Sequence, residues 1–162
     1  RIYAELGGGA LSADAYHITA PREDGTGAAQ AMTEALRAAG MQPQDVDYVA
    51  AHGTGTPLND VSETVAIKQA FGTHAARLAI SSPKSMVGHL MGAAGAVSAI
   101  ACVRAISDSC VPPTINLETA DPQCDLDYTP LKARPMNVRA ATANGFGFGG
   151  QNGCVIFRKY DA

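Results

Sequence analysis

The stretch GAAGAVSAIACVRAI, residues 92–106, is small or apolar at nearly every position and decides how the rest of the chain is arranged. Its one charged residue is Arg104, and it contains no proline. A helix that is apolar on all of its faces packs against neighbours on every side. We therefore expect residues 92–106 to form a buried helix in the middle layer of the protein.

Strand and helix patterns alternate on both sides of this predicted helix. Apolar positions recur at helical spacing between Gly27 and a stop at Gly40. They recur again over residues 60–71, where Asp60 and Glu63 are placed like a capping box. Strand patterns cover residues 1–6, 46–51, 77–82, 140–150 and 152–160, and the glycines at 7–9 allow a bulge or a sharp turn. This alternation predicts an α/β layered domain.

Composition excludes several classes of partner. The chain has 162 residues, 46% of them hydrophobic, and a formal net charge of −3. Its basic residues are scattered, so the sequence has no electrostatic footprint for nucleic acid or for an anionic membrane. The longest apolar stretch, residues 93–103, is far short of the roughly 20 residues that cross a bilayer. We expect a soluble protein, and a piece of a longer chain because it opens at Arg1 without an initiator methionine.

The cysteines and histidines do not form a metal-binding pattern. The four cysteines are too widely spaced for a zinc or redox motif, and three of them lie in or beside apolar runs: Cys102, Cys110, Cys124 and Cys154. Reduced thiols of this kind fit a cytosolic protein. Neither His52 nor His89 has a second ligand at short spacing except Asp60, eight positions after His52. We discount a metal site.

Chemistry concentrates where the predicted strands end. Strand 46–51 is followed by HGTGT, strand 77–82 by a segment that continues to GH, and the strand from 140 by NGFGFGG. Ligand sites in layered α/β sheets favour such strand ends. Four side chains of these segments could line one cleft: His52, Lys84, His89 and Phe148.

Each of these residues also has a purely structural interpretation. A lone histidine is more often a hydrogen-bonded structural residue than a catalytic one. Lys84 is by default a solvated surface lysine, and if it is buried it needs a partner such as Glu63. Glu63 is most simply a helix N-terminal cap. Phe146 and Phe148 could be core residues, although the glycines beside them give more freedom than a core strand uses.

Four motifs in order carry a resemblance to a known family: VAAHGTGTPLND, SSPKSMVGHLMGAAGAV, VPPTINLE and NGFGFGGQNG. The chain resembles the C-terminal half of a β-ketoacyl-acyl carrier protein synthase, most closely the elongating enzymes of dissociated (type II) fatty acid synthesis. The resemblance extends from Arg1 to Tyr160. It implies a thiolase-like layered fold, in which residues 1–162 form the C-terminal half of a duplicated α-β-α-β-α architecture. The family's nucleophilic cysteine lies in the N-terminal half, which is absent here.

The resemblance also implies roles for individual residues. His52 and His89 match the histidines that donate hydrogen bonds to the malonyl thioester carbonyl as carbon dioxide leaves. Lys84 matches a lysine expected to orient His89 through a network with Glu63. Two further matches concern the substrate: Thr54 and Thr56 hold the phosphopantetheine arm, and Phe148 gates the acyl pocket. On an extended segment, residues two apart face the same side, which accounts for the alternating threonines.

The implied partners follow from the same family. They are acyl carrier protein, whose phosphopantetheine carries the substrates, the N-terminal half of the same enzyme and a second copy in a homodimer. No cofactor is expected to be bound covalently, and neither nucleic acid nor membrane is expected. The fragment alone is expected to be inactive as an acyltransferase.

The chain departs from the family at three positions. Relatives usually have Thr at Pro83, Ser at Gly145 and Thr at Gln151, and none of these changes removes a proposed catalytic group. Gly145 and Gln151 flank the gating loop, so the mobility of the loop and the chain-length preference are not determined.

Two alternatives to a condensing enzyme remain open. One alternative is a non-catalytic subunit like the chain-length factors of polyketide synthases; both histidines and the lysine argue against it, but the missing nucleophile region decides. The other is a thiolase, which has a second catalytic cysteine near its C-terminus; Cys154 invites that comparison but lies in an apolar strand pattern.

Overall fold

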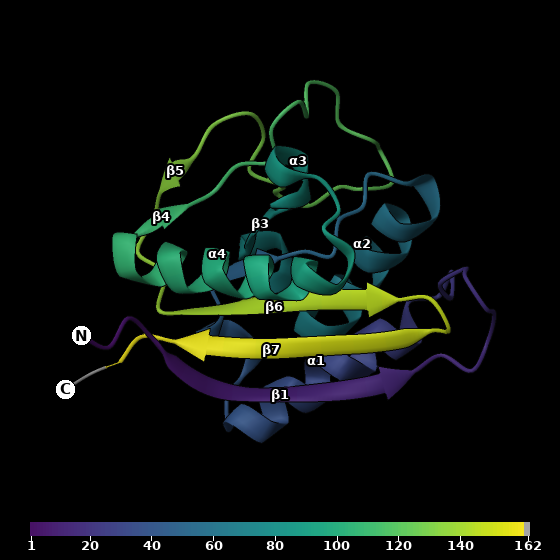
Figure 1. The fold of residues 1–162 in the computed structure, drawn as a ribbon, viewed down its shortest axis with the longest axis horizontal. Coiled ribbons are helices and arrows are strands. Elements are labelled where there is room, and N and C mark those ends of the chain that lie inside the picture. The colour runs from purple at the N-terminus through teal and green to yellow at the C-terminus, as the bar shows by residue number, and fades with distance from the viewer. Residues whose placement is uncertain (161–162) are drawn as a thin grey trace.

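The computed structural model describes residues 1–160 and contains a five-stranded mixed sheet in the order β1-β7-β6-β2-β3 (Figure 1). Strand β2 runs parallel to β3 and β6, whereas β7 runs antiparallel to both β6 and β1. The strands span Glu5–Ala13 (β1), Tyr48–Ala50 (β2), Ala79–Ser81 (β3), Ala140–Gly147 (β6) and Gln151–Arg158 (β7). A separate antiparallel pair is formed by β4 (Cys110–Val111) and β5 (Arg134–Pro135).

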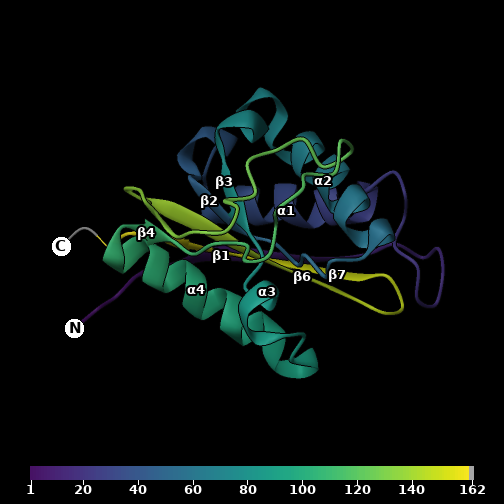
Figure 2. The ribbon, with the colours of Figure 1, turned by 90° about the horizontal axis from the view of Figure 1, so that it is seen from above.

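Helices cover both faces of the sheet, as the alternating sequence pattern predicted. Helices α1 (Thr26–Ala39) and α2 (Pro57–Phe71) lie on one face, and α4 (Ala94–Asp108) lies on the other (Figure 2). Each face has its own cluster of buried apolar side chains. The shorter helical pieces are η1 (Pro43–Asp45), η2 (Gly72–Arg77), α3 (Lys84–Val87) and η3 (Met91–Ala93).

The register of the parallel strands brings the predicted strand ends together. Ala50 of β2 lies opposite Ser81 of β3 on one side and Ala143 of β6 on the other. The three strands therefore deliver their following segments to the same edge of the sheet. This edge is where ligand sites of layered α/β folds are built.

The predicted boundaries of two elements are wrong. Strand β1 begins at Glu5 instead of Arg1 and continues through the glycine run, with a register shift between Leu6 and Gly8. A Cβ at Gly8 would lie 2.8 Å from the backbone nitrogen of Ala39, so this strand needs glycine to approach α1. Helix α2 begins at Pro57, before the predicted start.

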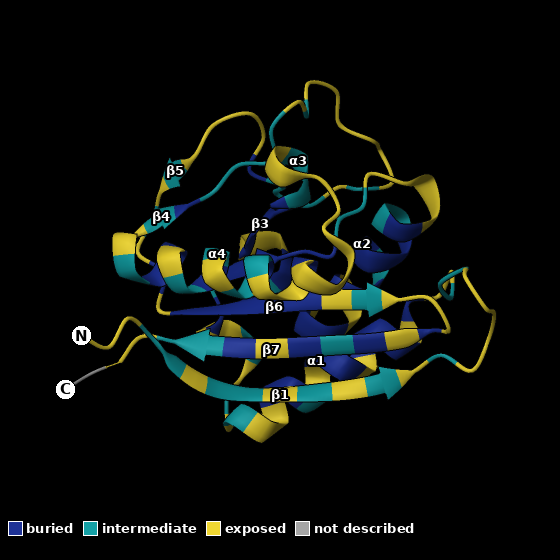
Figure 3. Cartoon of the chain, in the orientation of Figure 1, coloured by how far each residue is buried: buried dark blue, intermediate teal, exposed yellow. Residues whose placement is uncertain are grey.

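Helix α4 is not buried on all sides, which corrects the first expectation. Most of the residues that it buries recur three or four positions apart, namely Ala94, Ser98, Cys102 and Ala105, and Ile106 beside the last is also buried. The opposite side is open, and Ile100 is 61% exposed. Figure 3 shows exposed and half-buried residues along the side of α4 that faces away from the sheet. Within the chain alone, α4 is therefore an outer layer.

The helical region that contains α4 is longer than the apolar stretch of residues 93–103. Among residues 1–160, Met91–Asp108 has a mean hydropathy of 1.2 and is long and apolar enough to cross a membrane by length and composition. This is weak evidence for a span, because core helices of soluble proteins meet the same test.

Candidate active site

His52 is held at three points. Its backbone N–H donates to Glu63 Oε1 at 2.9 Å, and its carbonyl accepts from Lys84 Nζ at 2.5 Å. Its ring Nδ1 accepts the backbone N–H of Phe146 at 3.2 Å. The side chain is 8% exposed. These contacts come from α2, α3 and β6, so three elements fix the peptide and the ring of one histidine.

The contacts also set the protonation state of His52. A backbone N–H can donate only to a ring nitrogen that carries a lone pair, so the neutral ring bears its proton on Nε2. Burial, with the nearby Lys84 and His89, lowers the pKa of His52 to about 3. The imidazole is therefore neutral near pH 7 and presents an Nε2–H donor.

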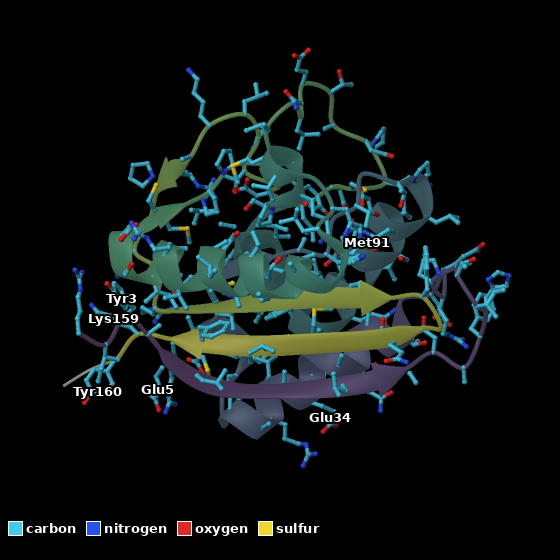
Figure 4. The ribbon with its side chains drawn as sticks, viewed as in Figure 1. Tyr3, Glu5, Glu34, Met91, Lys159 and Tyr160 are labelled. Carbon is cyan, nitrogen blue, oxygen red and sulfur yellow. The ribbon has the colours of Figure 1, made fainter. Side chains whose placement is uncertain are left out.

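His89 lies beside His52 and presents a matching donor. The two ring centroids are 5.6 Å apart and the ring planes meet at 81°. The Nδ1 of His89 accepts the backbone N–H of Met91 at 3.1 Å, so its neutral ring also carries the proton on Nε2. Figure 4 labels Met91 at the α2 end of α4. Two adjacent N–H donors of this kind suit the stabilisation of an oxygen that becomes negatively charged.

Glu63 supports the site from the protein interior. It is 3% exposed, and its carboxylate accepts three N–H groups: His52 N and Asn144 Nδ2 on Oε1, and Gly53 N on Oε2. Burial raises its pKa, and the three donors oppose that shift. The capping-box interpretation of Glu63 is wrong, because Thr56 caps α2 through the N–H of Asn59.

Lys84 contacts His52, and not Glu63 or His89 as predicted. It is half-buried, and burial lowers its pKa. Within residues 1–160 no hydrogen bond or ion pair joins Lys84 to Glu63 or to His89. Lys84 and Glu63 are linked through the backbone of His52, and His89 lies beside the His52 ring.

Thr54 and Thr56 face one another, although not for the reason predicted. Their hydroxyl oxygens are 2.8 Å apart. The segment is not extended, because Gly53 and Gly55 have φ angles of 44° and 71°. Gly53 and Gly55 have left-handed backbone conformations, which would be strained for other residues. These two glycines turn the threonines toward each other. Ser82 Oγ donates to the carbonyl of Gly53 at 2.6 Å and holds this turn.

Phe148 lies on the β6–β7 turn and is 76% exposed. The aromatic ring that contacts His52 is Phe146, at a centroid distance of 5.5 Å. The turn is tied to the loop after β1, since Gly149 N–H donates to the carbonyl of Ile18 at 2.7 Å. His52, Lys84 and His89 therefore lie next to one another, whereas Phe148 lies on an exposed turn.

Asn144 is a residue of the site that sequence reasoning missed. It is 2% exposed on β6 and contacts Glu63. The signal in the sequence was weak: it is the first residue of NGFGFGG, in which the glycines and phenylalanines drew attention.

A cavity of about 630 Å³ lies behind the HGTGT segment, between the start of α2 and residues 114–131. Gly53, Thr56 and Glu63 line it, but the rings of His52 and His89 do not. Among the residues that the structure describes, no three His, Cys, Asp or Glu side chains converge as metal ligands.

The cysteines are not set up as nucleophiles. Cys102 and Cys154 are buried, and burial raises the pKa of Cys154 to about 12 and that of Cys102 further. Cys124, which lines the cavity, also has a raised pKa because of burial. The thiolate is the reactive form of cysteine, and a raised pKa disfavours it in all three of these thiols.

Comparisons with known proteins point in one direction. The sequence family described as "Beta-ketoacyl synthase, C-terminal domain" matches residues 3–118. The chain is 55% identical over 160 residues to 3-oxoacyl-acyl-carrier-protein synthase 2 of Synechocystis sp., covering 99% of this chain and 38% of that protein. It is 48% identical to the protein of the same name from Staphylococcus aureus strain COL, covering 99% and 39%. The chain thus spans about two fifths of the length of these curated relatives.

Solved structures agree with the sequence matches. The ishigamide ketosynthase/chain length factor has a TM-score of 0.94 at 43% identity, covering 99% of this chain and 39% of that one. A type II PKS acyl-carrier protein in complex with its ketosynthase has a TM-score of 0.97 at 40% identity, covering 99% and 40%.

Proposed function

The chain belongs to the beta-ketoacyl synthase family and has its thiolase-like fold, and from this premise we propose the reaction of the complete protein. That reaction is the decarboxylative Claisen condensation of malonyl-acyl carrier protein with an enzyme-bound acyl group, which elongates fatty acids by two carbons. The observation that carries the proposal is the pair of adjacent imidazoles, each with its Nδ1 accepting a backbone N–H.

The two histidines act on the malonyl thioester. Its carbonyl oxygen accepts hydrogen bonds from Nε2–H of His52 and of His89. As the bond to the departing carboxylate breaks, its electron pair moves onto this oxygen as an enolate, and carbon dioxide leaves. The enolate carbon then attacks the acyl thioester on a cysteine of the N-terminal half, and the cysteine leaves as thiolate. Neutral donors stabilise the enolate without a fixed charge that would hold the carboxylate in place.

The remaining proposed site residues position the groups that react. Glu63 accepts the backbone N–H of His52, and Lys84 donates to its carbonyl. The paired hydroxyls of Thr54 and Thr56 would bind the phosphopantetheine arm, and Phe148 would gate the acyl pocket from the exposed turn.

The proposed partners are acyl carrier protein, the N-terminal half and a second copy of the enzyme in a homodimer. A structure that resembles this chain shows a ketosynthase with its acyl-carrier protein, which supports the first. We propose a cytoplasmic enzyme that binds no cofactor covalently and has neither nucleic acid nor membrane as a partner.

A chain-length-factor-like subunit is the second candidate, because similar structures are described as ketosynthases with chain length factors. Incubation of the complete protein with malonyl-acyl carrier protein tells the two apart. A condensing enzyme releases carbon dioxide and, with an acyl primer, forms a β-ketoacyl product, whereas a protein that releases none contradicts the proposal. A thiolase is disfavoured, since the pKa of Cys154 is raised to about 12.

Phe148→Ala should separate the two half-reactions in the complete enzyme. The change removes an exposed ring that does not contact His52, so malonyl decarboxylation should stay within about threefold of wild type while acyl transfer to the cysteine is impaired. Release of carbon dioxide and acylation with a labelled primer measure the two steps. Equal losses in both steps would favour a purely structural aromatic ring.

The isolated chain should associate and should not take up acyl groups. The outer side of α4 and the adjoining face of β1 and β7 expose Ile100, Leu11 and Val155, the last two on neighbouring strands. This apolar surface should exceed the few hundred Å² usual on a soluble monomer, and the N-terminal half is its proposed cover. Sedimentation and incubation with a radiolabelled acyl-carrier-protein thioester measure both properties. Stable labelling of a cysteine in a well-behaved monomer would contradict the placement of the nucleophile outside this chain.

A further inference from the structure

We propose that Asn144 is a positioning residue that holds His52 in place for the decarboxylation, an inference that rests on the proposed function. Among the described contacts, Asn144 makes no hydrogen bond to the His52 ring. Its Nδ2 donates to Glu63 Oε1 at 3.1 Å, and the same oxygen accepts the backbone N–H of His52 at 2.9 Å. The amide therefore acts on His52 through one carboxylate oxygen.

Strand β6 fixes His52 twice. The side chain of Asn144 steadies the His52 peptide through Glu63, and two residues later the backbone N–H of Phe146 donates to the His52 ring at Nδ1. One tie sets the position of the backbone and the other sets the rotation and the tautomer of the ring. A movement of β6 at residue 144 thus changes both, and with them the direction of the Nε2–H donor.

Asn144 supplies the Glu63 carboxylate with an uncharged side-chain donor. Two of its three partners are backbone N–H groups, so Asn144 is the one side chain, among the described residues, that donates to it. The Oδ1 of Asn144 is buried with no partner in the described structure. Burying an amide oxygen without a partner costs stability, so the benefit of asparagine here lies in its N–H group.

Replacing the Asn144 amide by a carboxyl group would place a new titratable group next to Glu63. Other titratable groups already lie near this carboxylate. His52 is neutral, and burial raises the pKa of Tyr128 and of Cys154, which keeps both protonated near pH 7. The charged or titratable groups that act on Glu63 come from α2, from α3, from β7 and from the segments after β2 and before β5: Asp60, Lys84, Cys154, His52 and Tyr128.

Asn144→Asp in the complete enzyme provides the test. At low pH the introduced carboxyl is protonated and donates its O–H to Glu63, as the amide did. At higher pH it ionises, two buried carboxylates repel each other and the hold on His52 is lost. The kcat for decarboxylation relative to wild type should therefore be near 1 at low pH and fall by up to about tenfold per pH unit above the pKa of the introduced group. KM for malonyl-acyl carrier protein should change little.

Two further variants complete the comparison. Asn144→Leu should lower kcat at least about tenfold, the value of one charge-assisted hydrogen bond, by the same factor at every pH. Thr142→Val is the matched control: Thr142 is buried on the same strand two residues earlier, and its hydroxyl has no partner in the described structure. Its ratio to wild type should stay near 1 at every pH.

The outcomes separate this inference from the proposed function. Two results would overturn the inference if wild type decarboxylates. One is a kcat ratio of Asn144→Asp to wild type that does not change with pH, and the other is an equal pH dependence of the corresponding ratio for Thr142→Val. If wild type does not decarboxylate, the proposed function fails, and the ¹⁵N signals of the His52 ring still provide a test. These signals should report the Nε2–H tautomer in wild type and should shift with pH in Asn144→Asp; unchanged signals would overturn the inference. Reversibility of the pH effect in one sample excludes misfolding as its cause.

Discussion

Replacing His52 with alanine in the complete enzyme should lower malonyl decarboxylation by about 100-fold or more, the usual cost of losing one oxyanion donor. His89→Ala should have a similar effect, because the two rings lie side by side with their centroids 5.6 Å apart and each has Nε2 as its free donor. The measurement is release of labelled carbon dioxide from malonyl-acyl carrier protein under single-turnover conditions.

Two controls make this result specific. Acylation of the cysteine by a primer should be much less affected in His52→Ala, since no enolate forms in that step. His74→Ala removes a histidine that bonds the carbonyl of Val46, away from the paired rings, and should keep wild-type decarboxylation. Wild-type rates in either active-site variant would overturn the assignment.

Glu63→Ala should lower the free energy of unfolding by about 3 kcal/mol or more. The change removes a buried carboxylate and leaves the N–H groups of His52, Gly53 and Asn144 without their acceptor. Unpaired buried donors are among the few causes of large single-residue losses. Denaturant unfolding of the complete enzyme gives the value, and decarboxylation should fall with it because the His52 peptide loses its anchor.

Glu34→Ala is the matched control for this substitution. Glu34 is a glutamate on α1 that pairs with Arg37 at the surface, and Figure 4 labels it at the edge of the molecule away from the site. Exposed pairs of this kind contribute about 0.2–1 kcal/mol. A loss in Glu63→Ala no larger than in Glu34→Ala would show that the buried contacts do not hold the site.

The sequence predicts the helices and strands of this fold better than it predicts what covers them. Helical spacing predicted α1 with its stop at Gly40, and the apolar run at 92–106 predicted a helix in the right place. The same run was wrongly expected to be buried on every side. Periodicity reports which residues avoid water, but what covers an apolar face depends on packing partners, and the described residues leave the outer side of α4 open.

The site shows the same division. Three of the four predicted cleft residues meet because parallel strands in register share one edge, a rule that works from sequence. The contacts that decide the chemistry could not be predicted: Glu63 reaches back to His52 across 11 positions, and Phe146 reaches His52 across 94. Contacts of this separation depend on tertiary packing. The threonine pair is instructive, since its facing hydroxyls were expected from extended backbone but arise from two left-handed glycines.

The position of β1 has a consequence for how this part of the protein is made. Among residues 1–160, strand β1 lies at the edge of the five-stranded sheet and pairs only with β7, with Glu5 opposite Arg158. During synthesis, β1 therefore emerges from the ribosome long before β7 is made. Until then its hydrogen-bonding edge has no partner strand. Such non-local pairing is slow to form and exposes the nascent chain to aggregation meanwhile. A ribosome that stalls before Gln151 leaves a chain in which β1 has no strand to join and β6 has an open edge.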